Sequence, residues 1–159
     1  MDVTDRRILD LLQSDASLTV KEIADQVHLS TTPCWKRIQK MEESGFIRAR
    51  VALLDPDKVN AGVTVFVAIK ASQHSRDWID RFHEAVAALP EIMEAYRMSG
   101  DIDYLLRVAV RDIGAYDRFY KKLIDRIHLS DVTSSFAMEQ IKYTTALPIN
   151  LNDNVSQMA

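Results

Sequence analysis

The chain has 159 residues and a formal net charge of −3, with 47% hydrophobic and 27% charged residues. These values are typical of one ordinary or two small folded domains, and they exclude an intrinsically disordered chain. No apolar stretch approaches the roughly 20 residues that span a bilayer, and residues 1–7 do not resemble a signal peptide, so we expect a cytoplasmic protein. The single cysteine, Cys34, excludes an intramolecular disulfide and a zinc site built on paired cysteines.

Basic residues are concentrated in one short region, although the chain as a whole is acidic. Residues 1–29 contain more acidic than basic side chains. Residues 30–50 have the opposite balance, since only Glu42 and Glu43 oppose Lys36, Arg37, Lys40, Arg48 and Arg50. Such a patch is expected where one face of a protein contacts phosphate groups, but a solvated helix face of mixed charge explains it equally well at this point.

The first third of the chain begins with two predicted helices. An apolar stripe predicts a helix over residues 5–13 with Thr4 as its N-cap; the stripe consists of Ile8, Leu9, Leu11 and Leu12. Thr19 and Glu22 have the spacing of a capping box, in which each side chain satisfies the free backbone amide of the other. This box predicts a second helix of about two turns, buried through Ile23, Ala24 and Val27.

A third helix is predicted over residues 31–44, with Ser30 as N-cap and Gly45 as the left-handed residue that ends it. Its apolar stripe consists of Cys34, Ile38 and Met41, so we expect Cys34 to be a small buried hydrophobic residue. Its other face presents Thr32, Lys36, Arg37 and Lys40. Two helices joined by a tight turn, the second with a basic free face, predict a helix-turn-helix.

A wing strand is predicted next to the helix-turn-helix. Residues 46–54 alternate apolar and basic side chains, as expected of such a strand. Pro56 and its flanking aspartates break the pattern, and residues 55–62 are expected to form a hinge. The predicted DNA-binding domain therefore covers residues 1–54.

The remainder predicts a second domain over residues 63–150, followed by a tail at 151–159. The expected strands are 63–71, 92–99, 104–110 and 132–141, and the expected helices are 78–89 and 116–127. The β-α-β-β-α-β order is that of a ferredoxin-like (ACT-like) fold, so the fold class is α+β. An open sheet covered by helices on one face needs a cover on the other. We therefore expect dimers that pack sheet on sheet, which would also let a helix-turn-helix read a two-fold DNA site.

Several motifs in register resemble the Lrp/AsnC family of feast/famine transcriptional regulators. They are LSTTPCWKRI at residues 29–38, ESGFI at 43–47, ALLDP at 52–56 and SGDIDYLL at 99–106. The phrases TPCWKR at 32–37 and SSFAMEQIKY at 134–143 are most similar to the branch that contains a cysteine-detoxification regulator, which would suggest cysteine as the effector. The resemblance implies an amino-acid effector held near the loop at 99–104 between dimers, and dimers joined into an octamer. His28 stands where the family usually has glycine, so a slightly strained left-handed turn is expected there.

The recognition helix supplies most of the candidate DNA contacts. Thr31 and Thr32 suit base edges, although Thr31 would serve equally well to support the cap. Arg37 can reach guanine O6 and N7 bidentately, while Lys36 and Lys40 suit phosphates. Trp35 either covers the edge of the core, which we favour, or packs against sugar-phosphate. The full candidate set is Ser30, Thr31, Thr32, Trp35, Lys36, Arg37, Lys40, Arg48 and Arg50.

The loop at residues 99–104 is the candidate effector site. Gly100 lets the backbone approach a ligand closely, Asp101 and Asp103 can pair with an ammonium group, and the free amides of the turn can hold a carboxylate. An ordinary β-turn with solvated aspartates is the alternative. The candidate set is Arg97, Met98, Ser99, Gly100, Asp101, Asp103 and Tyr104, with Ser134, Ser135, Phe136 and Met138 lining the wall supplied by a partner.

No catalytic motif is found. The four histidines are scattered, and no nucleophile, phosphate-binding or metal-binding signature accompanies them, so we expect neither an enzyme nor a cofactor or metal. The leading hypothesis is a regulator that binds double-stranded DNA and senses a small amino acid. The alternatives are an architectural DNA-binding protein without a ligand response, and an amino-acid-binding module with an incidental helix-turn-helix.

Overall fold

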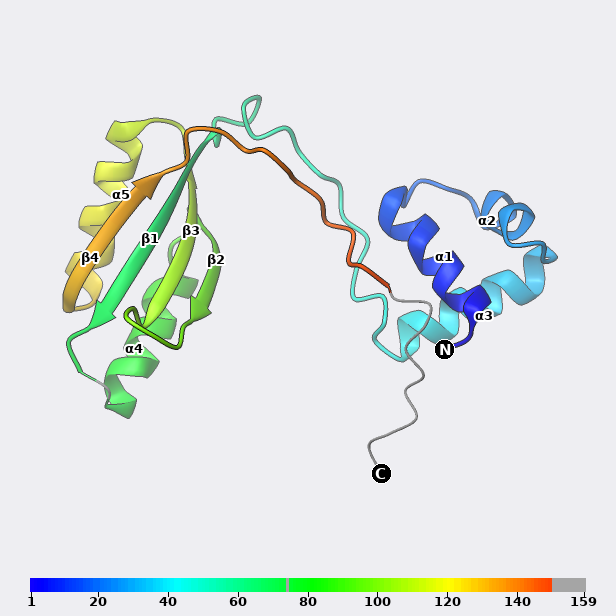
Figure 1. Ribbon diagram of the computed structural model, residues 1–159, viewed down its shortest axis with the longest axis horizontal. Coiled ribbons are helices and arrows are strands. Elements are labelled where there is room, and N and C mark those ends of the chain that lie inside the picture. The colour runs from blue at the N-terminus through cyan, green and yellow to red at the C-terminus, as the bar shows by residue number, and fades with distance from the viewer. Residues whose placement is uncertain (74, 150–159) are drawn as a thin grey trace. The chain divides into compact units, whose positions relative to one another are not determined.

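The computed structural model describes residues 1–73 and 75–149, and the chain forms two compact units (Figure 1). Of the described residues, one unit contains Met1–Ala52 and residues 142–149, and the other contains those within Leu53–Ile141. Among the described residues, no helix is both long enough and apolar enough to cross a bilayer.

The first unit is built on three helices, as predicted: α1 (Val3–Ser14), α2 (Val20–Gln26) and α3 (Thr31–Glu43). Their apolar faces meet in one core, which consists of Ile8, Leu12, Ile23, Ala24, Val27, Cys34, Ile38 and Met41. The expectation that Cys34 is a small buried residue is confirmed, and burial raises the pKa of its thiol.

The N-terminal caps agree with the sequence prediction at α2 but not at α1. The Thr19–Glu22 capping box is present and starts α2. Helix α1 begins earlier than predicted because Asp2, not Thr4, is its N-cap: the Asp5 amide donates to Asp2 (2.8 Å) and the Asp2 amide donates to Asp5 (2.9 Å). Ser30 occupies the cap position of α3 but makes no side-chain cap hydrogen bond.

Two left-handed residues shape the helix-turn-helix. His28 has φ 56° in the turn between α2 and α3, as the family resemblance implied, and Gly45 has φ 78° just after α3. The predicted wing strand at residues 46–54 is not formed. A strand needs a neighbouring strand to pair with, and no described strand lies beside this segment. The Ile47 amide still bonds to the Met41 carbonyl (3.2 Å), but the residues after it form no strand hydrogen bonds in the described chain.

The second unit is a four-stranded sheet with two helices, in the predicted β-α-β-β-α-β order. Its elements are β1 (Val63–Ala71), α4 (Arg76–Ala87), β2 (Ile92–Arg97), β3 (Tyr104–Val110), α5 (Ile113–Arg126) and β4 (Leu129–Phe136). The strand order is β2-β3-β1-β4, and each neighbouring pair is antiparallel. The ferredoxin-like prediction is therefore confirmed.

Several predicted boundaries move for identifiable reasons. Helix α5 begins earlier because the Asp112 side chain accepts the Ala115 amide and caps it. Strand β4 is shifted toward the N-terminus: it starts opposite Ala71, and after Phe136 only the Ala137 amide still bonds to β1, at the Thr64 carbonyl (2.9 Å). Because β1 begins at Val63, residues 139–141 lie beyond its end in this register, and the prediction that the strand continues to residue 141 was wrong.

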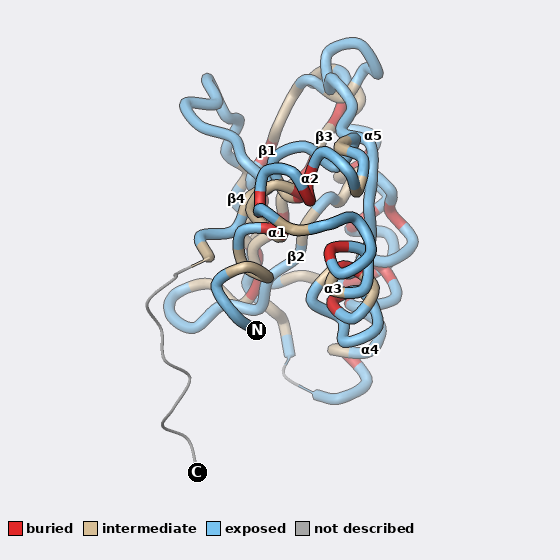
Figure 2. The backbone as a smooth tube through the Cα atoms, turned by 90° about the vertical axis from the view of Figure 1, so that its right-hand side faces the viewer, coloured by how far each residue is buried: buried red, intermediate tan, exposed pale blue. Residues whose placement is uncertain are grey.

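Both helices cover the same face of the sheet (Figure 2). Val65, Val67 and Ile69 of β1 are buried against aromatic residues of the helices, namely Trp78, Phe82, Tyr116 and Phe119. The intervening residues Phe66 and Lys70 lie on the opposite, exposed face, which we call the open face.

Candidate DNA interface and effector site

The exposed face of α3 carries most of the predicted DNA-contacting side chains. Because Cys34, Ile38 and Met41 hold the inner face of the helix in the core, the outer face is left to Thr31, Thr32, Trp35, Lys36 and Lys40, which are all exposed. Within the described chain, no ion pair engages Lys36 or Lys40. Trp35 is 46% exposed, and its role as a cover for the core edge stays a prediction.

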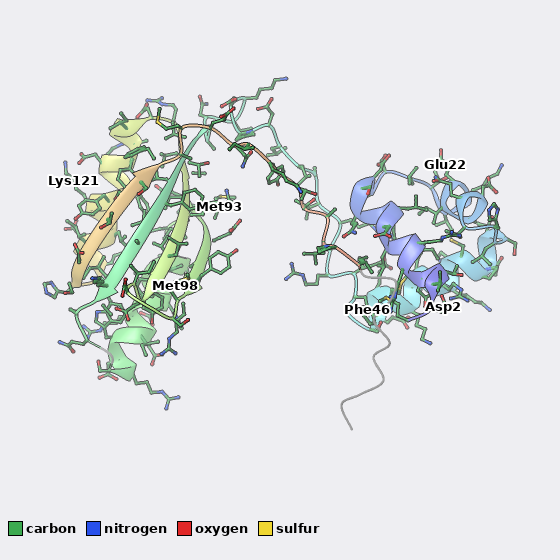
Figure 3. The ribbon with its side chains drawn as sticks, in the orientation of Figure 1. Asp2, Glu22, Phe46, Met93, Met98 and Lys121 are labelled. Carbon is green, nitrogen blue, oxygen red and sulfur yellow. The ribbon has the colours of Figure 1, made fainter. Side chains whose placement is uncertain are left out.

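Arg37 is held by the start of α1. Its Nη1 atom donates to Asp2 Oδ2 and to Asp5 Oδ1, both at 2.6 Å, and Asp2 is labelled in Figure 3. The other oxygen of each carboxylate accepts a backbone amide of the capping box. The pKa of Asp2 is lowered, first by the Asp5 amide and then by Arg37, and the pKa of Arg37 is raised by both carboxylates. The guanidinium therefore links the N-terminus of α1 to the recognition helix.

Arg48 and Arg50 follow α3 on the exposed segment. Arg50 donates to Glu42 at 2.8 Å, with both side chains about two-fifths exposed. In the part of the chain that the structure describes, Arg48 has no ion pair and is exposed. The basic residues thus fall into two groups: Arg37 and Arg50 are paired with acids, whereas Lys36, Lys40 and Arg48 point to solvent.

The loop between β2 and β3 is closed by backbone and by Asp103. The Met98 amide donates to the Asp103 carbonyl (2.8 Å), and the Asp103 amide donates to the Ile69 carbonyl (2.9 Å). The Asp103 carboxylate accepts the Ala71 amide (2.8 Å), so it ties the loop to the end of β1. Gly100 has φ 129°, a conformation that side chains disfavour, and Asp101 is exposed. Met98 marks this end of the sheet in Figure 3.

The remaining candidate effector residues are not gathered around this loop within one chain. Tyr104 is buried, with its ring 4.2 Å from that of Phe82. On β4, the Ser134 hydroxyl bonds to the Tyr116 hydroxyl, and Phe136 packs edge-on against the same ring. Strand β1 separates β4 from β3, so the β4 candidates and the loop lie on opposite sides of the central strand. Ser135 faces away from the helices, and Met138, at 96% exposure, lies beyond the strand.

A separate groove of about 290 Å³ lies between α5 and β4. Its lining is Tyr120, Ile124, Ile127, His128, Leu129, Ser130, Asp131 and Val132. None of the predicted effector residues is among them. The sequence analysis also missed Asp2 and Asp5; their three-residue spacing is visible in the sequence, but their pairing with Arg37 is not.

Replacing Arg37 by Met should destabilise the helical unit by about 1 kcal/mol at neutral pH, because two partly exposed ion pairs are lost. A carboxyl whose pKa is lowered stabilises the folded state above its ordinary value of 3.8, and this contribution disappears as pH falls through the lowered pKa. The variant should therefore lose less stability on acidification than the wild type. Urea unfolding followed by Trp35 fluorescence, in a Trp78→Phe background, measures both effects.

Arg48→Met is the matched control, since it removes the same charge without removing an ion pair. It should stay close to the wild type at every pH. Equal stability of Arg37→Met and Arg48→Met would contradict the linking role of Arg37.

Comparisons with known proteins agree with this architecture. Residues 1–48 match a family described as winged helix-turn-helix DNA-binding, and residues 64–147 match the Lrp/AsnC ligand binding domain. The chain is 52% identical to the DNA-binding transcriptional activator DecR of Escherichia coli, over 94% of this chain and 99% of the relative. It is 49% identical to the glutamate uptake regulatory protein of Zymomonas mobilis, over 94% and 91% of the two chains.

Solved structures give the same result. A crystal structure of an AsnC family transcriptional regulator from Agrobacterium tumefaciens has a TM-score of 0.91 and 64% identity, covering 93% of this chain and 97% of the other. A transcriptional regulator from Neisseria meningitidis, solved as an L-Met complex, has a TM-score of 0.90 and 34% identity, covering 94% and 97%. With both domains matched in order and full-length relatives well above 30% identity, the chain belongs to the Lrp/AsnC family.

Proposed function

We propose that this protein is a DNA-binding transcriptional regulator that responds to a small amino acid. The observation that carries the proposal is the exposed face of α3, which presents unpaired lysines and short hydroxyls on a folded helix-turn-helix. Its relatives are named as transcriptional regulators, and one relative was solved with L-Met. These names give no support to a catalytic role. A regulator of this kind would act in the cytoplasm, next to the chromosome.

We assign DNA binding to residues 1–54, a hinge to 55–62 and the effector and assembly functions to 63–150. Lys36 and Lys40 are proposed as phosphate contacts, with Thr31, Thr32 and Trp35 nearest to the bases. Ser30, Arg48 and Arg50 would support the same surface. Base reading by Arg37 stays a prediction, but it requires the guanidinium to leave two carboxylates, so the ion pairs favour a positioning role.

A DNA-selection experiment tests the proposal. The full chain should enrich one sequence from random duplex DNA. The logarithm of its affinity should then fall linearly with the logarithm of salt concentration, with a slope of about −0.9 per phosphate contact. Lys36→Ala and Lys40→Ala should each reduce the steepness by about 0.9, as measured by fluorescence anisotropy. Lys121→Ala, which removes a lysine paired with Asp117 on α5, is the control and should leave the slope unchanged.

Absence of any enriched sequence would overturn the proposal. An unchanged slope in both α3 variants would move the DNA contacts to another face.

We further propose that the effector is an amino acid held at the loop between β2 and β3. Asp101 is exposed and, among the described residues, takes part in no hydrogen bond or ion pair, which suits it to a ligand ammonium. Asp103 ties the loop to β1, which suits it to keeping the loop in shape. Candidate residues on β4 would have to reach this loop from another copy of the chain, because β1 lies between β4 and β3 within one chain.

A thermal-shift panel of the common amino acids should find one or a few that raise the melting temperature of the full chain, because a ligand that binds only the folded state stabilises it. Asp101→Ala should remove this shift without changing the melting temperature of the free protein. Asp103→Ala should lower the melting temperature of the free protein itself, since the Ala71 amide loses its partner. If no amino acid changes stability or DNA binding, the architectural alternative replaces the regulator.

Self-association is proposed through the open face of the sheet. Phe66 is 40% exposed and Tyr96 51% exposed on this face. One pair of charges on this face is satisfied within the chain: Arg107 donates twice to Glu94 (2.6 and 2.9 Å), and the Tyr96 hydroxyl donates to the other oxygen (2.8 Å). Arg107, followed by Tyr96, lowers the pKa of Glu94. Burying Arg107 and Glu94 costs less because they are already paired with each other, which favours sheet-on-sheet packing of two copies around Phe66 and Tyr96.

Phe66→Glu should break this packing, because it replaces an apolar ring on β1 by a carboxylate that would lose its hydration when two copies associate. Light scattering on the full chain should show a smaller particle than the wild type, and the wild-type mass also tests whether dimers join into the octamer that the family resemblance implies. Ile113→Glu adds the same charge at an exposed position at the start of α5 and should leave the mass unchanged. A wild-type monomer would contradict the proposal.

A further inference from the structure

Gln13, near the end of α1, makes two hydrogen bonds to the backbone of a residue far along the chain. Its Nε2 atom donates to the Leu147 carbonyl (2.9 Å), and its Oε1 atom accepts the Leu147 amide (2.9 Å). Both residues belong to the helical unit, which includes the chain from Lys142 onward. We call residues 142–149 the return segment.

The two bonds between Gln13 and Leu147 require a side-chain amide. A primary amide presents one donor and one acceptor side by side, so it pairs with both polar groups of one residue, as a neighbouring strand would. The second Nε2 hydrogen is used as well, because Asp10 Oδ1 accepts it at 3.1 Å. The Asp10 carboxylate can only accept a hydrogen bond, so it fixes the amide with its nitrogen toward the Leu147 carbonyl.

Leu147 is held through its backbone rather than through its side chain. The Leu147 side chain is 74% exposed, so it contributes little apolar burial. A further local bond, from the Ala146 amide to Thr144 Oγ1 (3.1 Å), shapes the chain just before the contact. The docking therefore depends on Gln13 more than on any apolar pocket for Leu147.

The return segment is the second place where the chain crosses between the two units. The chain passes from the helical unit to the sheet unit after Ala52 and returns after Ile141, following β4 (Figure 1). The Gln13 contact attaches the segment that follows β4 to α1. With it, the helical unit is connected to the sheet unit by two stretches of chain, one before β1 and one after β4.

We propose that Gln13 is a positioning residue that anchors the return segment on α1, and that this second connection raises the affinity of the dimer for DNA with two half-sites. The functional part rests on the proposed function. A helical unit that is joined to the sheet unit by one stretch of chain loses more orientational freedom when both copies of a dimer bind one duplex. A second connection removes part of this freedom before binding, so the helical unit of the second copy has a higher effective concentration at its half-site. Contact with a single half-site does not need this restriction. The candidate effector residues on β4 come just before the return segment. An effector bound to them would therefore contact the stretch of chain that is anchored on α1.

Hydrogen exchange tests the anchoring itself. Gln13→Glu keeps the shape of the side chain but sets a carboxylate against the Leu147 carbonyl and Asp10. In the full-length variant, the Leu147 amide should exchange about tenfold faster than in the wild type, while amides of α2 and α3 keep their rates. Gln26→Glu, an equal charge change at an exposed position of α2, should leave the Leu147 amide as protected as in the wild type. Equal exchange of this amide in the wild type and in Gln13→Glu would overturn the anchoring.

A second pair of variants leaves α1 untouched. Leu147→Pro removes the amide that Gln13 accepts, and Leu147→Ala keeps it while removing the same exposed side chain. Fluorescence anisotropy with duplexes bearing one or two copies of the half-site selected from random DNA gives the readout. Gln13→Glu and Leu147→Pro should lose at least about tenfold in affinity for the two-site duplex and stay within about twofold on the one-site duplex, whereas Leu147→Ala and Gln26→Glu should match the wild type on both.

The possible failures are distinguishable. An unchanged two-site affinity in Gln13→Glu and Leu147→Pro would overturn the functional role while the exchange data still report the anchoring. An equal loss on both duplexes would assign the contact to the stability of the helix-turn-helix instead. If the wild type selected no DNA sequence at all, the proposed function would fail, and the role in two-site binding would fail with it.

Discussion

The pairing of β1 with both β3 and β4 is the constraint on which the sheet unit depends. Because β1 lies between them, its alternation of apolar residues decides both faces at once: Val65, Val67 and Ile69 meet the helices, and Phe66 is left on the open face. The loop between β2 and β3 is attached to the end of the same strand through Asp103. The core, the proposed assembly surface and the candidate effector loop are therefore three consequences of one central strand.

The helical unit depends in a similar way on a compact polar cluster. The Asp2–Asp5 capping box uses one oxygen of each carboxylate for backbone amides and leaves the other for Arg37. A single guanidinium thus fixes the start of α1 against the recognition helix. The two ion pairs also distinguish Arg37 from the lysines of α3. An arginine held by two carboxylates attracts a phosphate only weakly, whereas Lys36 and Lys40 keep their full charge for this contact.

Family membership and geometry together explain how an acidic protein can be a DNA-binding regulator. The net charge of −3 is a sum over the whole chain and hides the local distribution of charge. What matters for DNA is the local field of the α3 face, since screening limits surface charges to a range of about 10 Å at moderate salt. Asp2 and Asp5 at the start of α1 pair with Arg37, and Asp117 on α5 pairs with Lys121, whereas no ion pair within the described residues engages Lys36 or Lys40.

The sequence by itself determined the features that depend on neighbours a few residues apart. The Thr19–Glu22 box, the left-handed Gly45, the strands expected at 63–71 and 104–110 and the family motifs all involve local spacing, and the α+β fold followed from them. Only the tertiary structure decided the contacts between distant residues. Arg37 meets Asp2 across 35 positions, Asp103 meets Ala71 across 32, and Gln13 meets Leu147 across 134. The end of β4 and the unformed wing strand belong to the same class, because a strand exists only where another strand lies beside it to accept its hydrogen bonds, and which segments lie side by side is settled by packing of the whole chain.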